Sequence, residues 1–232
     1  MSKDDDIIWI ASVDPGKKNF AFYIEEFNKN TILALPFIPK TQRYNINGSP
    51  SEKFSEIIEK VCINGKKILF KVVDLTSGCD KKTYLDTETF HNLTDILDEY
   101  TTYWDRCNGF IIEKQMSNGK QHNTMALKIA QHCWSYFSFR YSRFKPILEF
   151  PAYHKTQILG AEKIQKKLKS GKITYKAMDK PARKKWSIEK AIKILSDRLD
   201  NTTLSELTSI KKKDDLADVL CQLQAFKIIY IY

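Results

Sequence analysis

The sequence lacks long apolar runs, paired cysteines and a targeting pattern, and each absence removes a class of protein. No stretch approaches the roughly 18 consecutive apolar residues that indicate a transmembrane helix, so we expect no membrane contact. The five cysteines are odd in number and widely spaced, which argues against a disulfide framework and a zinc site. The first residues show neither a secretory apolar segment nor an Arg-rich transit pattern, so we expect an intracellular location and disfavour mitochondria.

The composition that is present fits a globular, basic protein. Hydrophobic residues make up 42% of the 232 residues, which is enough for one large domain with a core. Lysine and arginine outnumber aspartate and glutamate by 38 to 28, and basic residues concentrate at 163–185. A basic excess favours polyanionic partners because each neutralised phosphate releases counterions, although many basic surfaces are simply solvated. The acidic clusters lie elsewhere, so a basic surface and a separate acidic pocket are compatible.

The apolar run Ile7–Asp14 has the length and residue types of a central strand and stops at Pro15 and Gly16. On position alone its final carboxylate, Asp14, reads as a solvated turn residue. Two further acidic sites change that reading, because Glu113 lies in the strand-like segment 110–115 and three aspartates lie at 214–218. Carboxylates gathered at a sheet edge form a site for hard divalent cations, which prefer oxygen ligands. The pattern indicates a magnesium-dependent nuclease.

A helix is expected from about Lys213 toward Tyr230, and its periodicity separates the three aspartates. At about 100° per residue its leucine, valine and phenylalanine positions form one apolar face. Asp215 lies at the edge of that face and Asp218 roughly 60° further round, so both sit where the buried face meets solvent. The helix macrodipole alone accounts for Asp214, but it accounts less well for Asp218. We therefore take Asp215 and Asp218 as candidate ligands; a one-residue shift of the helix would exchange Asp215 for Asp214.

The rest of the chain predicts an α/β fold in which antiparallel strands come first, then alternating helices and strands, then a terminal helix. A second strand is expected at 20–27, and a third at either 31–38 or 67–75. Helices are expected at 52–61, at 88–106, at 123–141 and from 153 into the basic segment, with a strand at 146–150. Ser187 is a candidate cap for a further helix, and 200–209 is expected to be a polar linker.

Three stretches occur in a distinctive order along the chain: SVDPGKKN at 12–19, IIEKQ at 111–115 and KDDLAD at 213–218. Together they resemble the acidic motifs of the RuvC-like Holliday junction resolvases, most closely the poxvirus-type and fungal mitochondrial branches. LEFPAYHK at 148–155 resembles the segment that brings a basic residue to the active site, which nominates Lys155. RKK at 183–185 resembles a basic run of the same branches. The resemblance spans the chain from end to end, with insertions near 39–85 and 169–185.

The resemblance implies a single RNase H-like domain over 1–232, with a mixed five-stranded sheet flanked by helices. It implies two-metal phosphodiester hydrolysis with Mg²⁺, for which Mn²⁺ should substitute, and no small-molecule cofactor. Asp14 would be the shared ligand, Glu113, Asp215 and Asp218 would complete the two coordination spheres, and Lys155 would steady the developing phosphate charge. The implied activity is resolution of four-way DNA junctions in recombination and repair. Two symmetric cuts imply a homodimer that reads junction shape and phosphates more than base edges.

Other interpretations remain open. An RNase H-like nuclease that acts on other branched DNA or on flaps would carry the same metal site. A non-catalytic junction-binding protein would bind without cutting and would tolerate the loss of Asp14. The run DPGKKN at 14–19 also resembles the first phosphate loop of actin-like and sugar-kinase folds, but the Gly-rich turn of a second phosphate-binding lobe is missing downstream. The absent transit pattern favours a virus-encoded enzyme in the host cytoplasm or nucleus.

Overall fold

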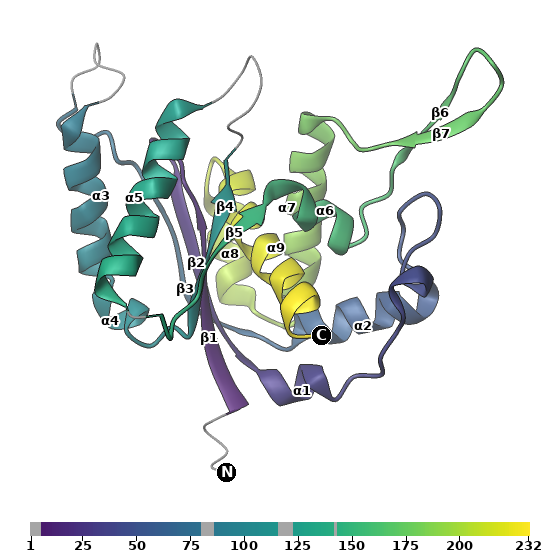
Figure 1. The fold of residues 1–232 in the computed structure, drawn as a ribbon, viewed down its shortest axis with the longest axis horizontal. Coiled ribbons are helices and arrows are strands. Elements are labelled where there is room, and N and C mark those ends of the chain that lie inside the picture. The colour runs from purple at the N-terminus through teal and green to yellow at the C-terminus, as the bar shows by residue number, and fades with distance from the viewer. Residues whose placement is uncertain (1–5, 80–85, 116–122, 142) are drawn as a thin grey trace. The chain divides into compact units, whose positions relative to one another are not determined.

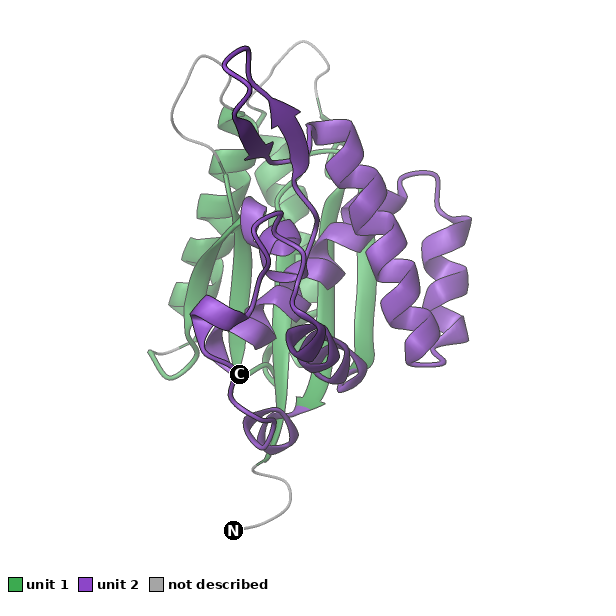
Figure 2. Cartoon of the chain, turned by 90° about the vertical axis from the view of Figure 1, so that its right-hand side faces the viewer, with its two compact units in different colours: residues 1–27, 66–152 green, residues 28–65, 153–232 purple. Residues whose placement is uncertain are grey.

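The computed structural model describes residues 6–79, 86–115, 123–141 and 143–232. The chain divides into two compact units, each made of two stretches (Figure 2). Unit 1 is Met1–Phe27 with Lys66–Ala152, and unit 2 is Asn28–Gly65 with Tyr153–Tyr232. The single domain over 1–232 stays a prediction. Residues 80–85 of the expected insertion at 39–85 lie outside the described ranges.

Unit 1 contains a five-stranded mixed sheet with the strand order β3-β2-β1-β4-β5 (Figure 1). Its strands are β1 (Ile7–Asp14), β2 (Phe20–Asn28), β3 (Lys66–Val73), β4 (Gly109–Lys114) and β5 (Ile147–Pro151). β4 runs parallel to both β1 and β5, and β2 runs antiparallel to β3. Only residues 15–19 join β1 to β2, a connection too short for a parallel crossover. The predicted α/β class and mixed five-stranded sheet are confirmed, and the third strand is the one expected at 67–75.

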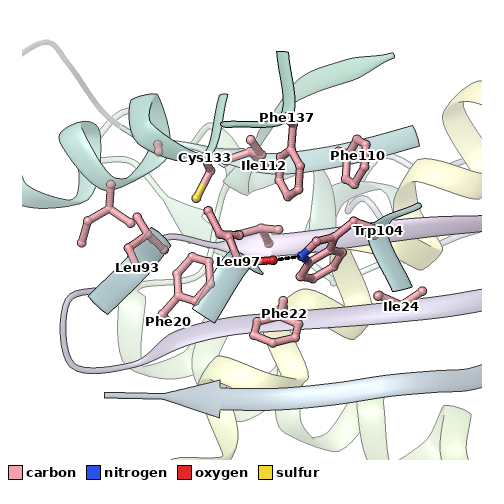
Figure 3. Close-up of a cluster of buried hydrophobic side chains, with 14 of the residues drawn as sticks. Phe20, Phe22, Ile24, Leu93, Leu97, Trp104, Phe110, Ile112, Cys133 and Phe137 are labelled. Atoms are coloured by element: carbon pink, nitrogen blue, oxygen red, sulfur yellow. Dashed lines mark hydrogen bonds between the residues drawn. The ribbon is translucent and has the colours of Figure 1, made fainter. Parts of the chain in front are cut away.

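The helices of unit 1 are α3 (Thr87–Glu99), α4 (Thr101–Trp104) and α5 (Thr124–Arg140), so the helix expected at 88–106 is divided at Tyr100. They share one hydrophobic core with alternate residues of β1, β2 and β4 (Figure 3). Within it Phe110 stacks on Phe137 with 4.0 Å between ring centroids. The indole Nε1 of Trp104 donates to the carbonyl oxygen of Leu97 at 2.8 Å, which satisfies the one polar atom of a fully buried side chain.

Unit 2 is mainly helical. Its elements are α1 (Lys29–Leu33), the 3-10 turn η2 (Lys40–Gln42), α2 (Glu52–Ile63), α6 (Ala152–Ile158), β6 (Ile164–Lys167), β7 (Ile173–Lys176), α7 (Lys180–Asp197), α8 (Asn201–Ser209) and α9 (Lys213–Tyr230). α9 has the bounds expected from its apolar pattern and packs against α7. The carbonyl oxygens at the end of α2 accept from distant cations, Cys62 O from Arg198 Nε and Asn64 O from Lys227 Nζ, each at 2.6 Å. Among all the described helices, none is long and apolar enough to cross a bilayer.

Two expectations for unit 2 are wrong because local groups override the apolar pattern. The candidate strand at 31–38 begins as helix α1, since the side chain of Asn28 accepts from Thr31 N at 2.9 Å and caps it. The helix expected from 153 ends at Ile158, and Gly160 follows with a φ of +83°. That left-handed conformation ends the helix and favours glycine.

Two further corrections concern the ends of helices. α7 begins at Lys180, where Asp179 caps Ala182 N at 2.9 Å, so Ser187 is a buried residue inside the helix and not its cap. The expected linker at 200–209 is helix α8, because Asp200 Oδ1 accepts from Thr203 N at 3.0 Å. In both places an aspartate supplies the capping oxygen for an orphan N–H group.

Candidate functional site

Asp14 and Glu113 are neighbours at the carboxyl ends of two parallel strands of unit 1. Asp14 ends β1, and Glu113 is the penultimate residue of β4. The register pairs Val13 with Ile112, so one residue further on Asp14 lies beside Glu113, at the roughly 4.8 Å spacing of adjacent strands. Val13 and Ile112 belong to the hydrophobic core that α3 and α5 cover, so the two carboxylates lie on the opposite face of the sheet. Both are half-buried.

The turn after Asp14 is tight enough to need glycine. A Cβ on Gly16 would lie 2.6 Å from the carbonyl oxygen of Asn19, closer than real Cβ contacts allow. The chain can therefore reverse directly after the strand, which fixes Asp14 as the last residue of β1.

Three aspartates of unit 2 lie in the first two turns of α9, and two of them are ion-paired. Lys184 Nζ, from α7, donates to Asp214 Oδ2. Lys155 Nζ, from α6, lies 3.3 Å from Asp218 Oδ2. Lys155 is only 5% exposed, so its charge is held inside the protein. Asp215 differs from both neighbours, because its Oδ2 is buried and has no hydrogen-bond partner within the described part of the chain.

Burial and charge shift the pKa values of two adjacent aspartates in opposite directions. Burial raises the pKa of Asp215, and the charge of Asp214 raises it further, against smaller lowering effects of Lys212 and Lys184. Burial also acts to raise the pKa of Asp214, but the hydrogen bond and charge of Lys184 outweigh it, so that pKa is lowered. The protein itself thus stabilises Asp214 as a carboxylate, whereas the partly buried surroundings of Asp215 disfavour its charged form.

The residue types fit a hard divalent cation. All four candidate ligands offer carboxylate oxygens, and the buried, unpaired Asp215 Oδ2 is an atom that a cation would satisfy. Over the described ranges no three His, Cys, Asp or Glu side chains are grouped closely enough to hold a metal ion. Of the expected set, the structure brings together Asp14 with Glu113 in unit 1, and Lys155 with Asp218 in unit 2.

Lys184 is the residue of this region that sequence reasoning missed. The basic run at 183–185 was noted, but the helix was expected to begin later, at Ser187. The structure places the run in the first turns of α7, where positive charge opposes the helix macrodipole. With the start of α7 placed at Lys180, the basic residues at 183–185 lie near the N-terminus of the helix. Several positive side chains at such a place are a signal that one of them has an acidic partner.

Comparison with known proteins gives relatives along the whole chain, although no protein-family model matches it. The "Uncharacterized protein 170L" of Invertebrate iridescent virus 6 is 38% identical over 240 residues, covering 98% of this chain and 92% of the relative. The chain belongs to the family of that viral protein. The "Uncharacterized protein 97L" of Invertebrate iridescent virus 3 is 29% identical and covers 94% of this chain and 98% of its own length. Both relatives are virus-encoded.

Solved structures similar to this family member are Holliday junction resolvases. RuvC of Thermus thermophilus, in complex with a Holliday junction substrate, aligns with a TM-score of 0.50 over 97% of each chain at 11% identity. The Holliday junction resolvase of fowlpox virus aligns with a TM-score of 0.47 over 94% of this chain and 97% of its own, at 16% identity. The likeness to RuvC shows the shared fold. The RNase H-like fold expected from the three acidic motifs is therefore confirmed.

Proposed function

We propose that the protein is a structure-specific endodeoxyribonuclease that resolves four-way DNA junctions by paired, Mg²⁺-dependent phosphodiester hydrolysis. The observation that carries the proposal is the buried Asp215 Oδ2, which lacks a hydrogen-bond partner within the described residues. A buried polar atom is unfavourable until it is paired, and a hard cation is a partner that carboxylate oxygens favour. The resolvase fold and the order of the acidic motifs support the choice of substrate.

The proposed ligand set is the one expected from the motifs. Asp14 would bind both metal ions, and Glu113, Asp215 and Asp218 would complete their coordination. Mn²⁺ should substitute for Mg²⁺ because it also accepts oxygen ligands. When bound, such ions supply Lewis acidity, which makes an attacking water more acidic and stabilises negative charge on the phosphate and the leaving 3′ oxygen.

The two lysines have different proposed roles. Lys184 engages Asp214, which supports leaving that carboxylate out of the ligand set in favour of Asp215. Lys155 brings a buried positive charge to within 3.3 Å of Asp218. We assign it to steadying the negative charge that develops on the phosphate, where a fixed charge acts most strongly if water is excluded.

Junction resolution requires two symmetric cuts, so the proposal includes a homodimer with two active sites. The partner is branched DNA. The basic excess at 163–185 supplies the positive charge that such a partner needs. Given its virus-encoded relatives, we infer that this chain is also virus-encoded and acts inside the host cell.

The decisive experiment is cleavage of a labelled synthetic four-way junction with Mg²⁺, with EDTA, and with Asp14→Asn. We expect paired nicks that yield ligatable duplexes, lost in EDTA and in the variant. Asp215→Asn should lose cleavage as Asp14→Asn does, whereas the matched Asp214→Asn should retain most of it.

Other outcomes reassign the function. Cleavage of flaps or linear duplex with the junction ignored would transfer it to an RNase H-like nuclease of different substrate. Tight junction binding without cleavage in any metal would leave a non-catalytic binding protein. Equal loss in Asp214→Asn and Asp215→Asn would remove the distinction between the two carboxylates.

A further inference from the structure

Unit 2 carries a lysine-rich ribbon formed by β6 and β7. The two strands pair antiparallel, with Gln165 opposite Tyr175 and Lys167 opposite Ile173 (Figure 1). Between residues 164 and 176 there are five lysines and no acidic residue, and every side chain of β6 is exposed. An isolated two-stranded ribbon buries little of its own surface. Its uncompensated positive charge is complementary to a polyanion.

A pocket of about 270 Å³ lies at the base of this ribbon, entirely within unit 2. Lys163, which precedes β6, and Met178, which follows β7, both line it. Tyr44, Ile158 and Arg183 line its other sides. The volume falls just below the roughly 300–1,000 Å³ of pockets for drug-sized ligands, so it suits a single ring system.

The walls of the pocket are held in place by contacts between segments far apart in the sequence. The Tyr44 hydroxyl donates to the carbonyl oxygen of Ile158 at 2.8 Å, and Lys163 N donates to the carbonyl oxygen of Asn47 at 2.7 Å. Gly160 approaches Pro50 so closely that a Cβ would lie 2.6 Å from the proline Cδ. The loop at 44–50 is thus fastened to the segment that leads into the ribbon, and the pocket is preformed.

Arg183 gives this pocket its chemistry. Its Nε is buried and has no hydrogen-bond partner within the described ranges. Arg183 itself lines the pocket, and its guanidinium carries five N–H donors and no acceptor, so a ligand that brings an acceptor would be stabilised there. The planar guanidinium suits an acceptor edge better than a single point charge.

The other residues that line the pocket determine which ligands with a hydrogen-bond acceptor would fit. Ile158, Ala161, Ala177 and Met178 are apolar and favour a ligand with flat, apolar faces. Glu162 also lines the pocket, and its carboxylate disfavours a bare phosphate. A purely apolar ligand would leave the Arg183 donor unsatisfied. A nucleobase meets all three conditions, because its faces stack and its edge carries both acceptors and donors.

We propose that the pocket at the base of the β6–β7 ribbon binds an unpaired nucleobase. The ribbon's charge favours a base that belongs to a DNA strand, and that choice of source rests on the proposed function. The same chemistry would also accept a free nucleotide, so the experiment separates the two sources.

The test compares two duplexes that differ only at one extrahelical position, which carries either a normal nucleotide or an abasic residue. Binding of the full chain is measured by fluorescence anisotropy in EDTA, so no cleavage intervenes. We expect about tenfold tighter binding of the duplex that carries the base, from stacking and edge contacts. Because both duplexes have the same phosphates, the ratio cancels non-specific electrostatic attraction.

Matched variants assign this ratio to the pocket. Arg183→Gln should bring it close to one, whereas Lys185→Gln should leave it unchanged; both remove one positive charge from the same basic run. Lys185 is 79% exposed and does not line the pocket. Ala177→Phe should abolish the ratio by filling the pocket without changing the charge. Far-UV circular dichroism verifies that each variant is folded.

A wild-type ratio near one, with no binding of deoxynucleoside monophosphates by calorimetry, overturns the inference. So does a ratio that survives both Arg183→Gln and Ala177→Phe. Monophosphate binding that Arg183→Gln abolishes, with a duplex ratio near one, keeps the base site and assigns it to a free nucleotide. The proposed function can fail separately. Tighter binding of the duplex that carries the base, without any junction cleavage, would support the nucleobase site and contradict the proposed nuclease activity.

Discussion

The two units hold their candidate carboxylates by different physical means. In unit 1, Asp14 and Glu113 are set side by side by the register of two parallel strands, a backbone constraint that survives changes of side chain. In unit 2, Asp214 and Asp218 are held by ion pairs with the lysine side chains of Lys184 and Lys155. The sheet of unit 1 therefore fixes the positions of its two carboxylates, whereas the lysines of unit 2 neutralise the charge of theirs. Under the proposed function, a bound cation would alter the ion pairs of unit 2 far more than the strand register of unit 1.

The largest effect should come from the sheet pair. Glu113→Gln should reduce junction cleavage by about 10²–10³-fold, the usual cost of removing one preorganised electrostatic group. The thermal midpoint should change little, because strand register and not the carboxylate holds the site. Single-turnover cleavage and thermal melting measure both quantities. Activity within a few-fold of wild type would exclude Glu113 from the site.

The next effect separates the adjacent residues Asp214 and Asp215 of unit 2 by the response of their variants to metal. At about 100 times its Kd, Mg²⁺ should stabilise the wild-type protein by roughly 2.7 kcal/mol, since it binds the folded state. The Asp215→Asn variant should lose most of this shift, and Asp214→Asn should keep it. Calorimetric melting with and without Mg²⁺ provides the measurement. The idea fails if all three proteins respond alike.

A smaller effect concerns the buried ion pair. Lys155→Met leaves the partly buried Asp218 without its lysine and should lower the free energy of unfolding by about 1–3 kcal/mol. Lys193→Met is the control, because its pairs with Glu59 and Asp197 are solvent-exposed and should contribute at most about 1 kcal/mol. Urea unfolding of both variants compares them. Equal losses would show that the burial of Lys155 does not matter.

The smallest effect is a shift in the thermal midpoint of the metal-free protein, and its sign should differ between Asp214→Asn and Asp215→Asn. Because the pKa of Asp214 is lowered, its stabilising contribution is present above the unfolded pKa and is lost as pH falls through the folded pKa. The pKa of Asp215 is raised, so its contribution is present at acid pH and is lost as pH rises through the folded pKa. At pH 7 Asp214→Asn should lower the thermal midpoint and Asp215→Asn should raise it, each by roughly 2–4 °C.

The comparison of these two variants is repeated at acid pH. The Asp215→Asn shift should shrink first, as pH falls through the raised folded pKa of Asp215, and the Asp214→Asn shift should shrink only at lower pH, as pH falls through the lowered folded pKa of Asp214. Shifts of the same sign at pH 7 would contradict the opposite environments of the two carboxyl groups.

Much of the sheet unit could be predicted from the sequence because its signals are strong and local. The continuous apolar run of β1 and the short apolar run of β4 predicted buried strands, and their acidic ends predicted that Asp14 and Glu113 would meet. The alternation of β4 also placed Glu113 on the correct face. The bounds of α9 followed from its apolar periodicity.

The helical unit was harder to predict because its structure depends on single capping groups and on tertiary contacts. Asn28 and Asp200 each start a helix that the apolar pattern did not indicate, and Asp179 starts α7 earlier than the expected cap at Ser187. The lysine-rich segment at 164–176 has no clear period of two, so the pattern predicts β6 as the end of a helix and assigns β7 to an insertion. The pairing of Lys184 with Asp214 joins two helices, and no local pattern specifies it.

The interrupted order of unit 2 along the chain has a consequence for synthesis on the ribosome. The carbonyl oxygens at the end of α2 accept hydrogen bonds from residues that are translated much later. Arg198 lies 136 residues after Cys62, and Lys227 lies 163 residues after Asn64. At about 5–20 residues per second, every strand of the five-stranded sheet is translated well before α9. The nascent chain therefore contains Asp14 and Glu113 early, and it gains the aspartates of α9 only after the five-stranded sheet and α7 have been synthesised. Under the proposed function, no cleavage is possible before α9 has been synthesised.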